Sequence, residues 1–128
     1  MAGRWRLADL SDLSLSAFTA GFVAVLVGFT SSVRREPVGV CGLITPWNYP
    51  LLLLAMKLGP ALITGNTVVV KPADTTPTTT VMLATLAADV LPAGVLNVIC
   101  GDRETGRSLV AHPGVDLISF TGSVEGGR

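Results

Sequence analysis

Cysteine and histidine are nearly absent from this sequence, which argues against disulfide frameworks and zinc sites. The chain has two cysteines and one histidine, with no CxxC motif and no histidine near either cysteine. Cys41 and Cys100 each lie in or beside an apolar, strand-like run, so we expect reduced, buried thiols and no metal. His112 precedes Pro113 at the predicted end of a helix, where we expect a structural cap.

An excess of charge of either sign is also missing. Nine Lys and Arg residues balance nine Asp and Glu residues, and charged residues make up 14% of the chain. A nucleic-acid-binding surface needs a basic stripe, so we predict no nucleic-acid partner. The length of 128 residues suffices for one small domain. We predict a cytoplasmic location, with membrane association as the alternative.

One stretch, residues 13–33, contains no charge at all and reads LSLSAFTAGFVAVLVGFTSSV. A helix of this length spans roughly 30 Å, the thickness of a bilayer core, so the favoured prediction is an apolar membrane helix. A secretory signal peptide is a second interpretation, disfavoured by Asp9 and Asp12 in front of the run. A segment without a native role, from a misjudged gene start or a fusion, is the third. We divide the chain into residues 1–33 and 34–128.

From Arg34 onward, strand-like and helix-like segments alternate, with Gly and Pro between them. Three consecutive valines at 68–70 indicate a strand buried on both faces, as in a parallel sheet. The order predicts an α/β fold with an incomplete Rossmann-like parallel sheet, β-α-β-α-β-α-β, preceded by the apolar helix. The predicted strands are 38–45, 67–71, 95–100 and 115–120.

Helix signals separate these strands. We predict helices over 50–64 with a break at Gly59-Pro60, from an N-cap at Thr76 to about residue 90, and over 102–111 with Asp102 as N-cap. A further helix is expected to begin at 121–123. The apolar face of the second helix is predicted to contain Val81, Met82, Leu86, Ala87 and Val90.

Two charged residues lie at the end of the second predicted strand, Lys71 as its last residue and Asp74 three residues later, and ligands of parallel sheets bind at the carboxyl ends of strands. A lysine there can donate to ribose hydroxyls or phosphate, and the acid can accept from vicinal hydroxyls. The acid would also repel a 2′-phosphate, which favours NAD over NADP. The alternative interpretation is an exposed lysine with Asp74 opening a turn.

Two turns carry the remaining candidates. Thr121-Gly122-Ser123 follows the fourth predicted strand and would present free N–H groups to a pyrophosphate, with a plain helix N-cap as the alternative. Asn48 lies in Pro46-Trp47-Asn48-Tyr49-Pro50, a rigid turn that suits a donor to an oxyanion, with a helix cap as the alternative. The Rossmann motif GxGxxG is absent from the sequence.

Several of these motifs, in the order in which they occur along residues 36–126, resemble the cofactor-binding domain of the NAD(P)-dependent aldehyde dehydrogenases. The stretch at 101–106 is most similar to the aminobutyraldehyde- and betaine-aldehyde-type members. Residues 13–33 separately resemble the first membrane helix of BenE-type benzoate/proton symporters. The motifs of the first resemblance are Ile44-Thr45-Pro46-Trp47-Asn48-Tyr49-Pro50, Gly65-Asn66-Thr67-Val68-Val69-Val70-Lys71-Pro72-Ala73-Asp74, Leu91-Pro92-Ala93-Gly94, His112-Pro113-Gly114 and Phe120-Thr121-Gly122-Ser123.

The resemblance to aldehyde dehydrogenases implies a role for each candidate residue. Lys71 and Asp74 would bind the adenosine ribose of NAD, or of NADP, because Asp74 is one methylene shorter than the family's Glu. Asn48 would donate to the oxyanion formed from the aldehyde. The remaining cofactor-binding candidates are Ile44, Thr45 and Trp47 near the nicotinamide, Gly122 and Ser123 at the pyrophosphate, and Gly101 and Thr121.

The resemblance also implies an activity, which is oxidation of an aldehyde to a carboxylic acid by homo-oligomeric enzymes. A Cys nucleophile and a Glu base carry that reaction, and both are expected in segments after Arg128. The chain is therefore predicted to be a cofactor-binding fragment, inactive alone. Two alternatives remain: a membrane-tethered, non-catalytic nucleotide-binding module, and a chimeric gene product with a transporter-derived N-terminus.

Overall fold

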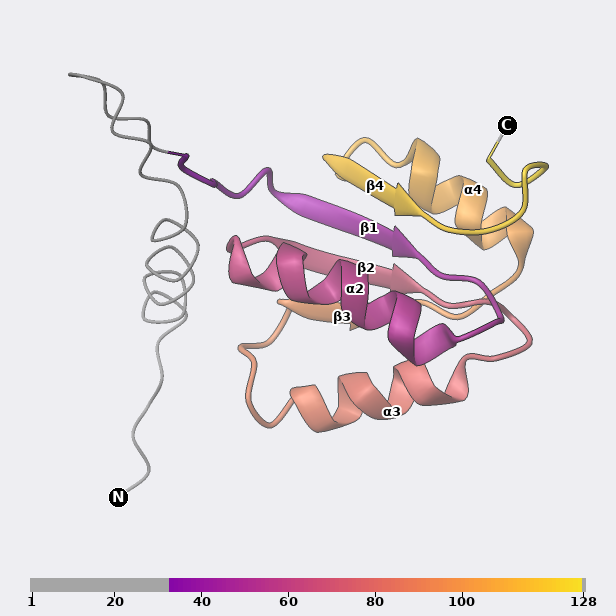
Figure 1. Ribbon diagram of the computed structural model, residues 1–128, viewed down its shortest axis with the longest axis horizontal. Coiled ribbons are helices and arrows are strands. Elements are labelled where there is room, and N and C mark those ends of the chain that lie inside the picture. The colour runs from indigo at the N-terminus through magenta and orange to yellow at the C-terminus, as the bar shows by residue number, and fades with distance from the viewer. Residues whose placement is uncertain (1–32, 128) are drawn as a thin grey trace, which may run out of the picture.

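The computed structural model describes residues 33–127, which form a parallel sheet with helices on both faces (Figure 1). The sheet has the order β3-β2-β1-β4, and each neighbouring pair of strands is parallel. The α/β, Rossmann-like fold class is confirmed. In chain order the elements are β1 (Val40–Ile44), α2 (Pro50–Ile63), β2 (Thr67–Lys71), α3 (Thr78–Ala87), β3 (Leu96–Val98), α4 (Arg103–Ala111) and β4 (Leu117–Phe120).

The apolar run at 13–33 lies outside the described residues, apart from Val33. Its predicted helix, its membrane association and its resemblance to a symporter helix therefore stay predictions, as does the division of the chain at residue 33. None of the helices within 33–127 has the length and apolar character needed to cross a bilayer.

The valine-rich strand β2 forms at its predicted bounds and lies between β1 and β3. Val68 and Val70 are completely buried, and both belong to one core cluster with Leu54 and Leu58 of α2. Leu43 of β1 completes this layer. The largest part of the core thus lies between the two central strands and α2, which holds the ends of these strands in fixed positions.

Asn66 closes the amino end of the sheet with side-chain hydrogen bonds. Its Oδ1 accepts from the backbone N–H groups of Val38 and Gly39, at 2.7 and 3.1 Å. Its Nδ2 donates to the carbonyl of Ala61 and to Oγ1 of Thr64, at 3.0 and 2.8 Å. One nearly buried amide therefore joins the segment before β1 to the end of α2.

Two further side chains hold strands at the same end. Asp116 lies directly before β4, and its Oδ2 accepts from the N–H of Val40 at 2.8 Å. Asn97 of β3 donates to the carbonyls of Val68 and Gly94, at 3.2 and 2.9 Å. These bonds add to the backbone ladder where the parallel strands begin.

The predicted break at Gly59-Pro60 does not split the first described helix, because α2 runs continuously over Pro50–Ile63 with Pro60 inside it. Pro60 has no N–H to donate to the carbonyl of Met56. Met56 lies on the exposed side of α2, where water can replace the lost hydrogen bond. Gly65 ends the segment with a φ of 85°, as expected for a helix C-terminal glycine.

The side of α3 that faces the core differs from the predicted one. Thr80 is buried and Leu83 packs against the core, whereas Met82 and Leu86 are 60% and 68% exposed. Val81 and Val90 are exposed as well. The helix contacts α2 and β3. A small side chain such as Thr80 lets α3 approach α2 and β3 closely. The buried face predicted from the apolar residues was therefore wrong.

The predicted N-cap of this helix is also wrong. α3 begins at Thr78, and within the described part of the chain no side chain caps its N-terminus. The hydroxyl of Thr76 donates to the carbonyl of Trp47 at 3.4 Å. Thr76 therefore links the loop after β2 to the loop after β1.

The opposite face of the sheet is covered by α4. Within residues 33–127, α4 contributes one buried residue, Leu109, which packs near Gly42 of β1. A Cβ built on Gly42 would lie 2.6 Å from Cδ1 of Ile118. Gly42 therefore lets β4 and α4 pack closely against β1.

Candidate functional site

The chain reverses direction across the sheet at β1. β1, β2 and β3 follow one another in one direction, joined by α2 and α3, whereas α4 leads back to β4 on the other side of β1 (Figure 1). Such a reversal opens a crevice at the carboxyl ends of the strands. A cavity of about 540 Å³ lies there, lined by Ile44, Lys71, Asp74, Asp102, Arg103, Gly106, Arg107, Val110, Phe120, Glu125 and Gly126.

The predicted pair Lys71 and Asp74 lies in this lining. Lys71 is only 6% exposed, and its Nζ donates to the carbonyl of Pro72 at 2.9 Å. Because an ammonium has three donors, this bond leaves others for a ligand. Asp74 is exposed and accepts from the N–H of Thr75 at 3.0 Å. Both groups therefore adjoin one cavity, and Ile44 joins them from the end of β1.

The helix α4 brings a second set of charges to the cavity. Asp102 is its N-cap, as predicted, and accepts from the N–H groups of Glu104 and Thr105 at 3.0 and 3.2 Å. These hydrogen bonds, chiefly that from Thr105, lower the pKa of Asp102. The predicted candidate Gly101 immediately precedes this cap, and a Cβ there would collide with the side chain of Thr105. Gly101 is therefore next to the cavity, but it is not one of the residues within 33–127 that line it.

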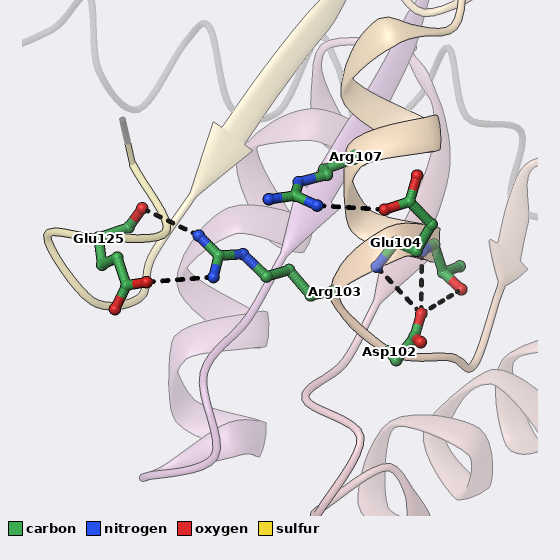
Figure 2. A network of polar contacts seen from close by, with 6 residues as sticks. Asp102, Arg103, Glu104, Arg107 and Glu125 are labelled. Carbon is green, nitrogen blue, oxygen red and sulfur yellow. Dashed lines mark hydrogen bonds and ion pairs between the residues drawn. The ribbon is translucent and has the colours of Figure 1, made fainter.

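Two ion pairs lie at the start of α4 (Figure 2). Arg103 pairs with Glu125 at 3.2 Å and also donates to the Glu125 carbonyl at 3.4 Å. Arg107 pairs with Glu104 at 3.2 Å. The first pair connects α4 to the turn after β4, so it forms part of the cavity wall.

The charged lining residues of α4 were not predicted as site residues. Sequence reasoning identified Asp102 as a cap and did not consider Arg103, Arg107 or Glu125. One signal was available: α4 begins directly after β3 and therefore at the edge of the sheet where Lys71 lies. Nothing in the local sequence indicated that the turn containing Glu125 folds back to meet Arg103.

The predicted residues after β1 have different environments. Thr45 is buried, and its N–H donates to the carbonyl of Lys71 at 3.2 Å. Its Oγ1 has no hydrogen-bond partner within residues 33–127. Trp47 and Asn48 are exposed, and neither belongs to the described lining of the cavity. Tyr49 has a φ of 49°, a strained value for a non-glycine residue, and marks a sharp turn before α2.

The turn after β4 is not the predicted start of a helix. Residues 121–127 contain no helix, and 124–127 form a turn in which the N–H of Gly126 donates to both the carbonyl and the Oγ of Ser123, each at 3.1 Å. Thr121 continues the ladder by donating to the carbonyl of Ile44 at 3.1 Å. A Cβ on Gly122 would lie 2.5 Å from the ring of Phe120, so the ring packs over this glycine. The cavity lining includes Phe120 and Gly126, but Thr121, Gly122 and Ser123 are not among its described residues.

The cysteines and the histidine lie away from the cavity lining. Both cysteines are free; Cys41 is buried in β1, whereas Cys100 is exposed, which contradicts its predicted burial. Burial, and secondarily the charge of Asp116, raises the pKa of Cys41, so a reactive thiolate is disfavoured there. His112 is the C-cap residue of α4, and its Nδ1 accepts from the N–H of Gly114 at 3.0 Å. Among residues 33–127 no group of acidic, His and Cys side chains could hold a metal ion.

A protein-family model described as "Aldehyde dehydrogenase family" matches residues 16–128. The chain belongs to the aldehyde dehydrogenase family. The match begins within the apolar run and covers all of the described residues. The family resemblance of the sequence motifs is thus confirmed.

Curated relatives in this family have diverse names. Retinaldehyde dehydrogenase 3 of Rattus norvegicus is 55% identical over 97 residues, which cover 74% of this chain and 19% of that enzyme. Aminoacetaldehyde dehydrogenase of Pseudomonas aeruginosa is 46% identical over 127 residues, which cover 98% of this chain and 25% of that enzyme. The chain thus spans about a fifth to a quarter of the length of these relatives.

Solved aldehyde dehydrogenases share the fold. Betaine aldehyde dehydrogenase from Staphylococcus aureus, crystallised in complex with NAD+, matches with a TM-score of 0.72 and 36% identity, over 93% of this chain and 25% of that one. The enzyme from Bartonella henselae matches with a TM-score of 0.75 and 34% identity, over 94% of this chain and 27% of that one.

Proposed function

We propose that this chain is the cofactor-binding part of an NAD-dependent aldehyde dehydrogenase, an enzyme that oxidises an aldehyde to a carboxylic acid. The observation that carries the proposal is that Ile44, Lys71 and Asp74 line one cavity at the reversal point of the sheet. Its volume of about 540 Å³ lies in the range of small-molecule sites. A family member of the same fold has been crystallised with NAD+, which supports this choice of cofactor.

The donor and acceptor groups of the cavity suit an adenosine ribose. Lys71 has N–H donors left after its bond to Pro72, and Asp74 supplies a carboxylate that can accept from hydroxyls. Burial of the Lys71 stem fixes the position of its ammonium. In this proposal Ile44 and Thr45 lie beside the nicotinamide half, and Gly122 and Ser123 contact the pyrophosphate. Gly101 and Thr121 are the remaining proposed cofactor-binding residues.

The residues after β1 would act on the aldehyde. Asn48 is exposed at the carboxyl end of β1, where its amide is accessible to an oxyanion, and Trp47 would border the same region. Neither cysteine suits the nucleophile: Cys41 is buried with a raised pKa, and Cys100 does not line the cavity. When bound, the nicotinamide supplies the hydride acceptor. We therefore propose that this chain binds the cofactor and does not oxidise an aldehyde by itself.

The substrate is proposed only as an aldehyde. The relatives are named for compounds as different as retinaldehyde and aminoacetaldehyde. The stretch at 101–106, which resembles amino-aldehyde members, leads into α4 beside the proposed cofactor cavity. Its similarity therefore concerns the cofactor end of the site, and the aldehyde type stays a prediction.

Calorimetric titration of the 128-residue chain with NAD+ tests the proposal. We expect measurable binding that Asp74→Ala weakens, because the ribose hydroxyls lose their acceptor. Asp89→Ala is the matched control, since Asp89 is an exposed carboxylate after α3. Absence of binding, or equal binding by the two variants, would contradict the proposal. Rapid aldehyde-dependent NADH formation by the chain alone would contradict its inactivity.

A further inference from the structure

The helices α2 and α3 carry large apolar side chains on the side that faces away from the sheet. On α2, Leu52, Met56 and Ile63 are 58%, 66% and 47% exposed, and on α3 Met82 and Leu86 are more than half exposed. Spacings of four and seven residues place these side chains in one stripe along each helix. The two helices pack against each other (Figure 1), so the stripes adjoin. We call these five side chains the outer apolar face.

The outer apolar face has almost no charge of its own. α3 contains no charged residue, and the one charged residue of α2 is Lys57. Lys57 donates to Ser119 of β4 at 2.8 Å, so its ammonium is directed toward the sheet and not toward this face. An occupant with charged side chains would bury them here without counter-charges, which costs free energy. The face therefore suits an occupant that has none.

The same chain contains such a segment, residues 13–32, which include no Asp, Glu, Lys or Arg. The family match begins at residue 16, and the alignment with aminoacetaldehyde dehydrogenase covers 98% of the chain. Both matches therefore include most of this segment. This favours a segment that belongs with the domain over one joined to it from another gene.

The chain enters the described fold beside the outer apolar face. The N–H of Val38 donates to Oδ1 of Asn66, directly after α2, at 2.7 Å. A Cβ built on Gly65 would lie 3.8 Å from Cβ of Pro37. The residues before β1 therefore adjoin the C-terminal end of α2, where Ile63 lies.

The segment is long enough to cover the face and is tethered close to it. α2 has 14 residues and is about 21 Å long. Residues 13–32 span about 30 Å even at the 1.5 Å per residue of an α-helix, so they can reach along the whole of α2. Because only residues 33–37 separate the segment from Val38, its effective concentration at the face is about millimolar. A second copy of the chain at micromolar concentration competes poorly with such a tether.

We propose that residues 13–32 dock on the outer apolar face of their own chain and do not insert into a membrane. Docking removes two uncharged, apolar surfaces from water at once, which is the main favourable contribution to association in water. The five side chains of the face are not among the described residues that line the cofactor cavity. The proposal therefore stands independently of the proposed function.

A photoreactive side chain on the face identifies its occupant. We expect p-benzoylphenylalanine in place of Leu86 to cross-link, in the full chain, to a peptide within residues 13–32 of the same molecule, as read by mass spectrometry of the monomer band. The same group in place of Val124, which is exposed in the turn after β4, is the matched control and should not reach this segment. Cross-links between two copies, or monomer cross-links that omit residues 13–32, overturn the proposal.

Chymotrypsin measures the docking without a cross-linker, because Phe18, Phe22 and Phe29 are cleavage sites within the segment. Met82→Asp combined with Leu86→Asp should speed the initial cleavage about tenfold, since docking would then bury carboxylates. Val124→Asp should leave the rate unchanged, and circular dichroism checks that both variants stay folded. Equal cleavage of the wild type and the double variant overturns the proposal. If the double variant unfolds, the cross-link from position 86 decides.

Flotation with vesicles of phosphatidylcholine and phosphatidylglycerol distinguishes docking from membrane insertion. We expect the wild-type chain to stay in the unbound fraction. The Met82→Asp, Leu86→Asp variant should float in larger proportion, because it releases the apolar segment. Flotation of the wild type to the same extent as the variant would show that the segment prefers the bilayer, and the proposal would fail.

Discussion

The two ends of the sheet differ in how their polar groups are used. At the amino end, Asn66 makes four hydrogen bonds and Asp116 holds the first residue of β1. At the carboxyl end, and among residues 33–127, Thr45 carries a buried hydroxyl without a partner, and the Lys71 ammonium donates to the carbonyl of Pro72. The polar side chains named at the amino end are committed to the fold, whereas Thr45 and Lys71 at the carboxyl end keep groups available to a ligand.

This difference assigns stability and binding to opposite ends of the same strands. Buried polar groups are normally paired, so an unpaired one marks a place where structure is not the main requirement. The same core holds both ends of β2 in place, because Val68 and Val70 lie between these ends and are buried in that core. Substitutions at the two ends should therefore have separable effects.

The largest effect is expected from Asn66→Ala at the amino end. The substitution leaves the N–H groups of Val38 and Gly39 without their acceptor and removes the link to the end of α2. Two orphaned, partly buried donors should lower the free energy of unfolding by about 2–4 kcal/mol. Urea unfolding followed by circular dichroism measures the change.

Asn97→Ala is the matched control, because Asn97 makes two bonds at the outer strand β3, one of them exposed. We expect a smaller loss, about 1 kcal/mol. Equal losses in the two variants would contradict the special role of Asn66.

The sequence predicted the fold better than the site, for reasons visible in particular residues. The valine run and the Asp102 cap are local signals, and they located β2 and the start of α4. Lys71 and Asp74 were found because strand order alone places them at the binding edge. The pair Arg103–Glu125 depends on a turn that folds back over α4, and no local pattern encodes that contact.

The errors have the same origin. The large apolar residues of α3 suggested one buried face, but packing against α2 and β3 selected the small residue Thr80. The sequence at 121–123 resembles a helix start, yet 121–127 contain no helix. In α3, tertiary contacts outweighed local propensity.

Lys71→Met should give the largest effect at the carboxyl end. Methionine keeps the buried stem beside Gly106 and removes the ammonium, so the free energy of unfolding should change by less than about 1 kcal/mol. Binding of adenosine 5′-monophosphate should weaken about tenfold or more, since charged hydrogen bonds are lost. Calorimetric titration and urea unfolding of the same samples separate the two quantities.

Lys57→Met is the control for this variant. Lys57 of α2 donates to Ser119 of β4 at 2.8 Å. Lys57 is not one of the described residues that line the cavity. We expect unchanged nucleotide binding. Loss of binding in both variants would mean that the effect is not local to the cavity.

Acidification should loosen the α4 wall of the cavity. The hydrogen bonds from Thr105 and Glu104 lower the pKa of Asp102 in the folded chain. A lowered folded pKa gives a stabilising contribution that is present above the unfolded pKa and disappears as the pH falls through the folded pKa. Relative to its intrinsic rate, which itself slows as the pH falls, amide exchange at Glu104 and Thr105 should therefore accelerate in acid in the wild type. In Asp102→Ala it should be fast already at neutral pH, and equal exchange in the two proteins at neutral pH would contradict the cap.

The smallest effect is expected from Thr45→Val, and its sign is the informative part. The Thr45 hydroxyl is buried without a partner among the described residues. Removing this hydroxyl from water therefore costs free energy that no hydrogen bond offsets. Valine has nearly the same shape and suits a strand end, so the free energy of unfolding should stay equal or rise by up to about 1 kcal/mol. Thr64→Val is the contrasting control, because the Thr64 hydroxyl donates to Pro60 at 2.7 Å and accepts from Asn66 at 2.8 Å. Urea unfolding should show a loss for Thr64→Val and none for Thr45→Val, since a hydroxyl at the amino end belongs to the fold and one at the carboxyl end does not.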